Sequence, residues 1–185
     1  PTPPQTPLTP LRGRLYTYQL VKRKILGSNK DESDLLIDLG FGFFRNIESR
    51  QAANFSEGAI VESRPAEDAY KFYSGKRTIK DLYTYQARVE KVIDGDTLKV
   101  RLDLGFDSWS RQVLRLRGID CPEINTAAGE KAKALVQSLL KETDWIIVRS
   151  SRSDKYDRYL ADIFIGEIYL NNLLLENNLA RRMAQ

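Results

Sequence analysis

The sequence predicts an α+β fold in which a small five-stranded β-barrel occupies the second half of the chain. Two patterns carry this prediction. Apolar and polar residues alternate strictly from Leu98 to Phe106, which is typical of a half-buried strand. After Thr126, apolar residues instead recur at helical spacing. The helix follows the third of five predicted strands, and this order favours a barrel with an inserted helix.

The first twelve residues form a proline-rich lead-in. Residues 1–10 hold five of the seven prolines, a density typical of an extended or flexible segment without a core of its own. A tail explains such a segment, and a docking peptide is the alternative.

An imperfect internal repeat follows the lead-in. The string Leu-Tyr-Thr-Tyr-Gln occurs at 15–19 and again at 82–86, and Asp-Leu-Gly-Phe occurs at 38–41 and again at 103–106. We therefore divide the chain into the lead-in 1–12, a partial β-rich copy at 13–80, and a complete copy at 81–185. Within the first copy, a hairpin is expected around Ile60 and Tyr70, with a proline in its turn region.

The second copy carries the longer series of elements. A run before the acidic turn at 94–96 is the first strand, and strands are expected at 98–106, 112–119, 145–148 and 160–165. The helix that begins at Thr126 is followed, near the end of the chain, by a second helix predicted at 171–182.

Composition excludes several classes of function. The chain has no histidine, so neither histidine acid–base catalysis nor a histidine-ligated zinc site can exist in it. Its single cysteine, Cys121, excludes an internal disulfide. No apolar run reaches the roughly 18 residues of a membrane span, and no signal peptide is recognisable. The chain begins with Pro1, so we expect a fragment or a processed form, and its cellular location is not predicted.

Carboxylates and arginines gather where the predicted strands end. Asp94 and Asp96 flank one glycine, and such a cluster repels itself unless a cation or protons neutralise it. Arg115 lies on the third strand, five residues before Asp120, and Glu123 follows three residues later. A further charged string, Asp-Lys-Tyr-Asp-Arg, occupies 154–158. The loops of a small barrel can meet at one rim, which would bring these groups together.

These motifs resemble the staphylococcal nuclease family over residues 83–182. The shared pattern is an Asp-Gly-Asp-Thr turn, an arginine five residues before Asp-x-Pro-Glu, and a later Asp-Lys-Tyr-x-Arg. The resemblance implies an OB-type barrel, a calcium-dependent phosphodiesterase, and single-stranded DNA or RNA as the substrate, with little sequence preference.

The resemblance also implies a role for each residue. Asp96, Asp120 and the backbone carbonyl of Cys121 would hold Ca²⁺, and Asp94 would act through water as an outer ligand; Mg²⁺ also tolerates such a ligand set. Arg115 and Arg158 would bind phosphate oxygens in the transition state. Glu123 would act as general base or would only orient water, and Lys155 and Tyr156 would hold a neighbouring phosphate.

Simpler interpretations stay open for single residues. Arg115 alone could be a surface charge, Arg158 a salt-bridge partner of Asp154 or Asp157, and Asp120 a turn residue. For the whole chain, two alternatives are a catalytically silent nucleic-acid-binding barrel and an assembly module that self-associates through its N-terminal copy.

The first copy lacks half of the implied site. Aligned on Asp38 and Asp103 without gaps, it keeps Asp31 and Arg50, but Phe55 and Gly58 stand where Asp120 and Glu123 are in the second copy. We therefore expect residues 13–80 to be a degenerate, non-catalytic partial barrel.

Overall fold

The computed structural model describes residues 5–24, 33–67, 69–143, 145–153 and 159–183. The chain divides into two compact units. Unit 1 consists of Pro1–Arg12, Tyr85–Asp103 and Trp109–Gln185, and unit 2 consists of Gly13–Thr84 and Leu104–Ser108. Among the described residues, no helix is long and apolar enough to cross a membrane.

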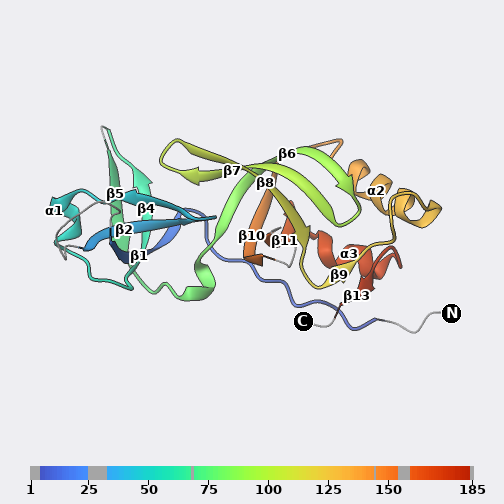
Figure 1. Ribbon diagram of the computed structural model, residues 1–185, viewed down its shortest axis with the longest axis horizontal. Helices are drawn as coiled ribbons and strands as arrows, with labels where there is room; N and C mark the ends of the chain where they lie inside the picture. The colour runs from blue at the N-terminus through green and yellow to red at the C-terminus, as the bar shows by residue number, and fades with distance from the viewer. Residues whose placement is uncertain (1–4, 25–32, 68, 144, 154–158, 184–185) are drawn as a thin grey trace. The chain divides into compact units, whose positions relative to one another are not determined.

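Unit 1 is built on a closed β-barrel of five strands (Figure 1). The strands are β6 (Thr84–Asp94), β7 (Thr97–Gly105), β8 (Ser108–Leu116), β10 (Trp145–Ser153) and β11 (Tyr159–Ile165). β6, β7 and β8 follow one another in the sheet, β8 pairs in parallel with β11, and β10 pairs with both β6 and β11. The second pairing of β10 closes the barrel, and the predicted fold class is confirmed.

The alternation read from the sequence produces the barrel core. Leu98, Val100 and Leu102 are fully buried, whereas Lys99 between them is exposed. Successive side chains of a strand point to opposite faces, so one face of β7 fills the barrel and the other meets solvent.

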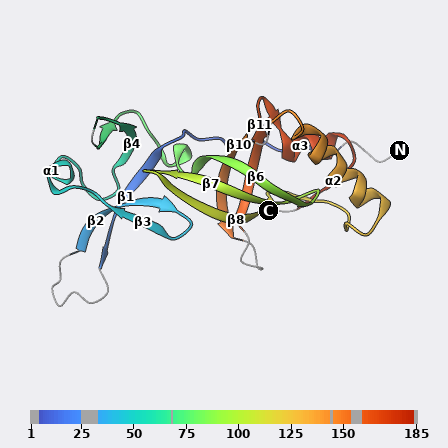
Figure 2. The same ribbon diagram turned by 90° about the horizontal axis from the view of Figure 1, so that it is seen from above.

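The predicted helix is α2 (Ala127–Leu139), which begins one residue after Thr126. The Thr126 hydroxyl accepts a hydrogen bond from the backbone N–H of Gly129 at 3.0 Å and so caps the helix. The buried face of α2 includes Ala132 and Val136. Figures 1 and 2 both show α2 beside the turn between β6 and β7.

The last predicted helix is shorter in the structure and is followed by a strand. After β12 (Ile168–Tyr169), α3 spans Leu170–Glu176, and β13 (Arg181–Arg182) pairs antiparallel with β9 (Ile119–Asp120). The prediction of one helix to residue 182 is therefore wrong. Asn178 takes a left-handed conformation (φ 55°), and Leu179 N–H donates to the carbonyl of Leu174, a Schellman motif that ends the helix.

The N-terminal segment 5–12 lies against unit 1. Leu8 is buried, and its N–H donates to Oδ1 of Asn172 at 2.9 Å. The Leu11 N–H donates to Oδ1 of Asp162 at 3.2 Å. The sequence predicts that the lead-in has no core of its own; in the structure Leu8 is buried whereas Leu11 is exposed.

A buried ion pair connects Arg117, the residue that directly follows β8, to Asp162 on β11. Arg117 Nε and Nη2 each lie 2.8 Å from an oxygen of Asp162, which is fully buried. The Tyr169 hydroxyl donates to the same carboxylate at 2.5 Å. This bonding raises the pKa of the Arg117 guanidinium, and burial followed by the bond to Asp162 raises the pKa of the Tyr169 phenol. Both oxygens of the buried Asp162 carboxylate thus have hydrogen-bond donors, and the Arg117 guanidinium has its counter-charge.

Unit 2 is a five-stranded antiparallel sheet in the order β3-β2-β1-β4-β5. Its elements are β1 (Thr17–Lys24), β2 (Ser33–Gly40), β3 (Phe43–Asn46), α1 (Ser49–Ala52), β4 (Ile60–Pro65), β5 (Tyr70–Ser74) and the short 3₁₀ helix η1 (Ile79–Asp81). β4 and β5 form the hairpin expected around Ile60 and Tyr70.

The matching sequence strings take matching conformations. Tyr16 and Tyr83 have φ values of 53° and 58°, and Phe41 and Phe106 have values of 54° and 55°. Leu20 pairs with Ile37 in unit 2, and the aligned pair in the second copy is Ala87 with Leu102. Both copies thus begin as a meander with the same register between the first two strands and a two-residue turn after the second.

Candidate active site

The turn between β6 and β7 is packed tightly against α2. A Cβ atom on Gly95 would lie 2.6 Å from Cβ of Ala132 and 2.9 Å from Sγ of Cys121. Both separations are shorter than real Cβ contacts, so only glycine fits here. The backbone N–H of Asp96 donates to Oδ1 of Asp94 at 3.1 Å, which holds the Asp94 carboxylate against the turn.

Asp96 is the buried member of the site. Its exposed fraction is 3%, and its Oδ2 accepts a 2.7 Å hydrogen bond from the backbone N–H of Cys121 while Oδ1 accepts one from Thr97 Oγ1 at 3.0 Å. Burial raises the pKa of this carboxyl, and the Cys121 N–H and the Arg115 charge oppose the rise. The barrel thus keeps a buried carboxylate that Cys121, Thr97 and Arg115 compensate with hydrogen bonds and charge.

Arg115 connects the two separated acidic segments. Its Nη2 lies 3.5 Å from Oδ2 of Asp96 and 2.6 Å from Oδ1 of Asp120. The two carboxylate oxygens can therefore be no further apart than the sum of these distances. The structure brings the side chains of Asp96, Arg115 and Asp120 together.

The thiol of Cys121 lies in surroundings that disfavour its charged form. Burial is the largest cause that raises the pKa of its thiol, and the charges of Asp96, Asp94 and Asp120 raise it further. A thiol that stays protonated is a poor nucleophile. Its backbone N–H, in contrast, is tied directly to Asp96.

Glu123 lies on the loop between β9 and α2, and its side chain is exposed. The backbone of this loop is fixed, because the Glu123 carbonyl accepts from the hydroxyl and the N–H of Thr126 at 2.7 and 3.0 Å. A Cβ on Gly129 would meet the Glu123 carbonyl, so glycine at this position lets the helix approach the loop. The loop is rigid at its base while the carboxylate reaches solvent.

Three predicted residues, Lys155, Tyr156 and Arg158, lie outside the described residues. Two other residues at the site were not predicted from the sequence. Arg181 Nη2 lies 3.5 Å from Oδ2 of Asp120, and Sδ of Met183 lies 3.9 Å from Nη2 of Arg115. The two adjacent arginines at 181 and 182 could have indicated a basic contribution to the site. They were assigned to the helix predicted over 171–182, and their place in a strand was therefore missed.

The donor chemistry of the site fits a hard divalent cation. Asp96 and Asp120 offer carboxylate oxygens, and the Cys121 carbonyl and water could complete a shell of oxygen ligands. Among the described residues, no group of three or more acidic, cysteine or histidine side chains is arranged to hold a metal. A cation here would therefore depend on two carboxylates, with backbone and water supplying the remainder.

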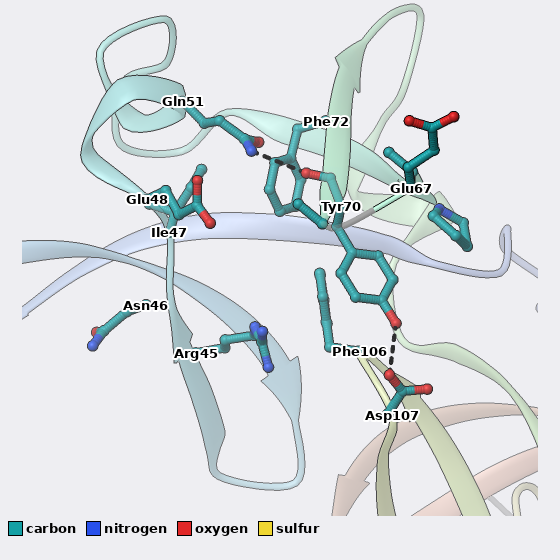
Figure 3. A pocket seen from close by; sticks show the side chains of 13 residues that line it. Arg45, Asn46, Ile47, Glu48, Gln51, Glu67, Tyr70, Phe72, Phe106 and Asp107 are labelled. Carbon is teal, nitrogen blue, oxygen red and sulfur yellow. Dashed lines mark hydrogen bonds between the residues drawn. The ribbon is translucent and has the colours of Figure 1, made fainter.

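Unit 2 contains a separate pocket of about 560 Å³ (Figure 3). Phe106 forms its aromatic wall with Tyr70 at a 4.6 Å centroid distance, and the Arg45 guanidinium lies over Phe106 at 4.9 Å. The Tyr70 hydroxyl faces Asp107 at 3.4 Å. Among the described residues, no arginine is seen to contact two carboxylates of this pocket, as Arg115 does in unit 1. Phosphodiester chemistry is therefore better supported in unit 1.

Comparison with known proteins agrees with this choice. Residues 113–185 match the family of staphylococcal nuclease homologues. The match begins within β8 and includes Arg115, Asp120 and Glu123. The resemblance inferred from the motifs is confirmed over these matched residues, and it indicates a nuclease family.

Two relatives extend the comparison beyond the family match. An uncharacterized protein of Methanocaldococcus jannaschii is 33% identical over 126 residues, covering 52% of this chain and 58% of that protein. An uncharacterized protein of Bacillus anthracis is 28% identical over 125 residues, covering 63% of this chain and 55% of that protein. The chain thus spans little more than half the length of either relative.

Proposed function

We propose that unit 1 is a metal-dependent nuclease that hydrolyses phosphodiester bonds in DNA or RNA. The observation that carries the proposal is the contact of Arg115 with both Asp96 and Asp120, within a chain whose residues 113–185 match staphylococcal nuclease homologues. A guanidinium and two carboxylates from separate segments form a bipolar site, which can hold a cation and an anionic phosphate side by side.

Asp96, Asp120 and the carbonyl of Cys121 would hold the cation, with Asp94 as an outer ligand. Calcium suits a set of oxygen ligands completed by water, and magnesium tolerates two carboxylates with several waters. The chemistry that a bound divalent ion supplies is polarisation of a phosphate oxygen.

The remaining groups of the chain act on the substrate directly. Arg115, with its forked donors, binds a phosphate oxygen whose charge grows in the transition state. Arg158 is proposed to supply a second guanidinium. Glu123 is solvent-exposed, so its carboxylate can reach a water molecule and accept its proton, a contribution typically of about 10²–10⁴-fold.

Recognition is proposed to depend on the sugar–phosphate backbone. Lys155 and Tyr156 would hold a neighbouring phosphate, and contacts of this kind position a strand without reading its bases. Single strands are the proposed substrate because they expose each phosphate without the constraint of a duplex. Sequence specificity is accordingly low.

Incubation of the chain with fluorescent single-stranded DNA, in calcium, in magnesium and in chelator, tests the proposal. Cleavage in the presence of a divalent ion and its loss on chelation are expected. Cleavage that persists in chelator contradicts the metal-dependent mechanism. Binding of the strand without cleavage under any condition would instead identify a nucleic-acid-binding module.

A further inference from the structure

The strand β13 brings a second arginine to the site. Arg181 pairs with Asp120 across the β9–β13 ladder, and Arg182 pairs with Ile119. The Met183 N–H also donates to the Gly118 carbonyl at 3.0 Å, which continues the contact between the two segments. The backbone thus places residue 181 opposite the carboxylate that Arg115 also contacts.

The Asp120 carboxylate lies between two guanidinium groups of different burial. Arg115 contacts one oxygen at 2.6 Å, and its side chain is 17% exposed. Arg181 contacts the other oxygen at 3.5 Å, and its side chain is 85% exposed. An exposed ion pair contributes little to stability. The stability of the fold therefore does not account for a guanidinium at this position, and its long side chain can turn from Asp120 to a phosphate.

The neighbouring arginine faces away from the site. Successive side chains of a strand point to opposite faces, and Arg182 Nη1 donates to the carbonyl of Thr6 at 3.3 Å instead. The two adjacent arginines carry the same charge on the same short strand, yet only Arg181 contacts an acidic residue of the candidate site.

The N-terminal segment holds β13 at its outer edge. The side-chain amide of Gln5 donates to the carbonyl of Ala180 at 2.9 Å and accepts from the N–H of Arg182 at 2.7 Å. One amide group thus pairs with the backbone on both sides of Arg181, in the way that a neighbouring strand would. Figure 1 shows the N-terminal segment, drawn in blue, passing beside β13.

We propose that Arg181 is a substrate-binding residue that contacts a phosphate of the nucleic-acid strand next to the scissile phosphate. Gln5 is a positioning residue, because it fixes the short strand that carries Arg181. The inference rests on the proposed nuclease function and adds a residue and a segment to it. One contact of this kind adds affinity for the backbone of a single strand and no base preference.

Binding measured without cleavage tests this proposal. Fluorescence anisotropy of a labelled oligothymidylate is recorded in chelator over a range of salt concentrations. Arg181→Ala is expected to weaken binding about 3- to 10-fold at low salt, and to reduce the slope of log K against log salt by roughly 0.7, the value for one phosphate of a single strand. Arg181→Lys keeps the charge and should recover most of the affinity.

Arg182→Ala is the matched control, since it removes the same charge from the opposite face. It is expected to change affinity less than about twofold. Gln5→Ala should reduce affinity and slope in the direction of Arg181→Ala. Gln5→Glu can accept from the Arg182 N–H but cannot donate to the Ala180 carbonyl. Its affinity should therefore fall between those of the unaltered chain and Gln5→Ala.

The outcomes separate the two proposals. Equal effects of Arg181→Ala and Arg182→Ala, in a chain that binds and cleaves the strand, overturn the role of Arg181 and leave the nuclease function standing. Failure of the unaltered chain to bind or cleave single strands overturns the proposed function itself. If Gln5→Ala also lowers the thermal midpoint strongly, the two arginine variants decide the matter alone.

Discussion

Substitution of Gly95 by alanine tests whether the acidic turn is held by its packing against α2. The added Cβ would lie 2.6 Å from Cβ of Ala132 and 2.9 Å from Sγ of Cys121. Ala132 is fully buried in the helix, so it cannot move without shifting the helix. The turn must move instead, and Asp96 moves with it.

The expected cost follows from the size of the clash. One extra methyl group in a well-packed core costs about 1–3 kcal/mol. In a domain the size of unit 1, each kcal/mol lowers the thermal midpoint by roughly 4 °C or more. We therefore expect Gly95→Ala to lower the free energy of unfolding of unit 1 by about 2 kcal/mol.

Urea and thermal unfolding, followed by circular dichroism, measure this cost. Gly75→Ala is the control, because a Cβ on Gly75 would meet nothing within 4 Å. The control should be neutral or slightly stabilising. The double variant Gly95→Ala with Ala132→Gly removes the closer contact, so it should be less destabilised than the sum of the single changes by at least about 0.5 kcal/mol.

A variant Gly95→Ala that unfolds like the unaltered chain would refute this packing. So would strict additivity with Ala132→Gly, since residues in contact are expected to couple. Calcium titration followed by calorimetry adds a second measurement. If the turn positions Asp96, the variant should also bind the cation more weakly.

Other variants test the site and the two units separately. Asn171→Ala should destabilise unit 1 by about 3 kcal/mol or more in urea unfolding, because its buried amide satisfies the Ile163 N–H and two backbone carbonyls, which would lose their partner; a loss below 1 kcal/mol would mean that water replaces the amide. Arg115→Lys should slow DNA cleavage strongly, since an ammonium cannot span the same groups, whereas Arg111→Lys, an exposed charge on the same strand, should not; equal rates for the two would contradict the site. Glu123→Ser should slow cleavage by about 10²-fold or more while calcium binding persists, and an unchanged rate would exclude it as the base. Tyr18→Phe should destabilise unit 2 by about 1–2 kcal/mol, because the buried Leu104 carbonyl loses its 2.7 Å hydrogen bond; an unchanged urea midpoint would show that this bond contributes nothing.

Local patterns predicted the elements whose residues decide their own conformation. Alternation predicted β7, and helical spacing predicted the start of α2 to within one residue. The end of α3 was missed because Asn177 and Asn178 carry a weaker stop signal than glycine. The left-handed backbone at Asn178 and the Schellman hydrogen bonds there ended the helix at Glu176.

Sequence patterns singled out some residues of the candidate site, but they did not show that Arg181 also belongs to it. The spacing of Arg115, Asp120 and Glu123 in the sequence was enough to select them. The arrival of Arg181 beside Asp120 depends on the pairing of β13 with β9, across about sixty residues of chain. Short strands of two residues leave no periodic signal, so sequence patterns cannot reveal them.

The sequence by itself predicted the barrel and its inserted helix, because alternation and helical spacing are local properties of the chain. The acidic and basic residues of the candidate site were selected through the family resemblance that their motifs carry. Only the tertiary structure decided that Arg115 joins Asp96 to Asp120 while Arg117 pairs with Asp162. Arg115 lies on β8 and Arg117 directly follows the end of that strand, and both carry the same charge. The carboxylate that each one meets is supplied by a distant segment, and that choice depends on the folded backbone.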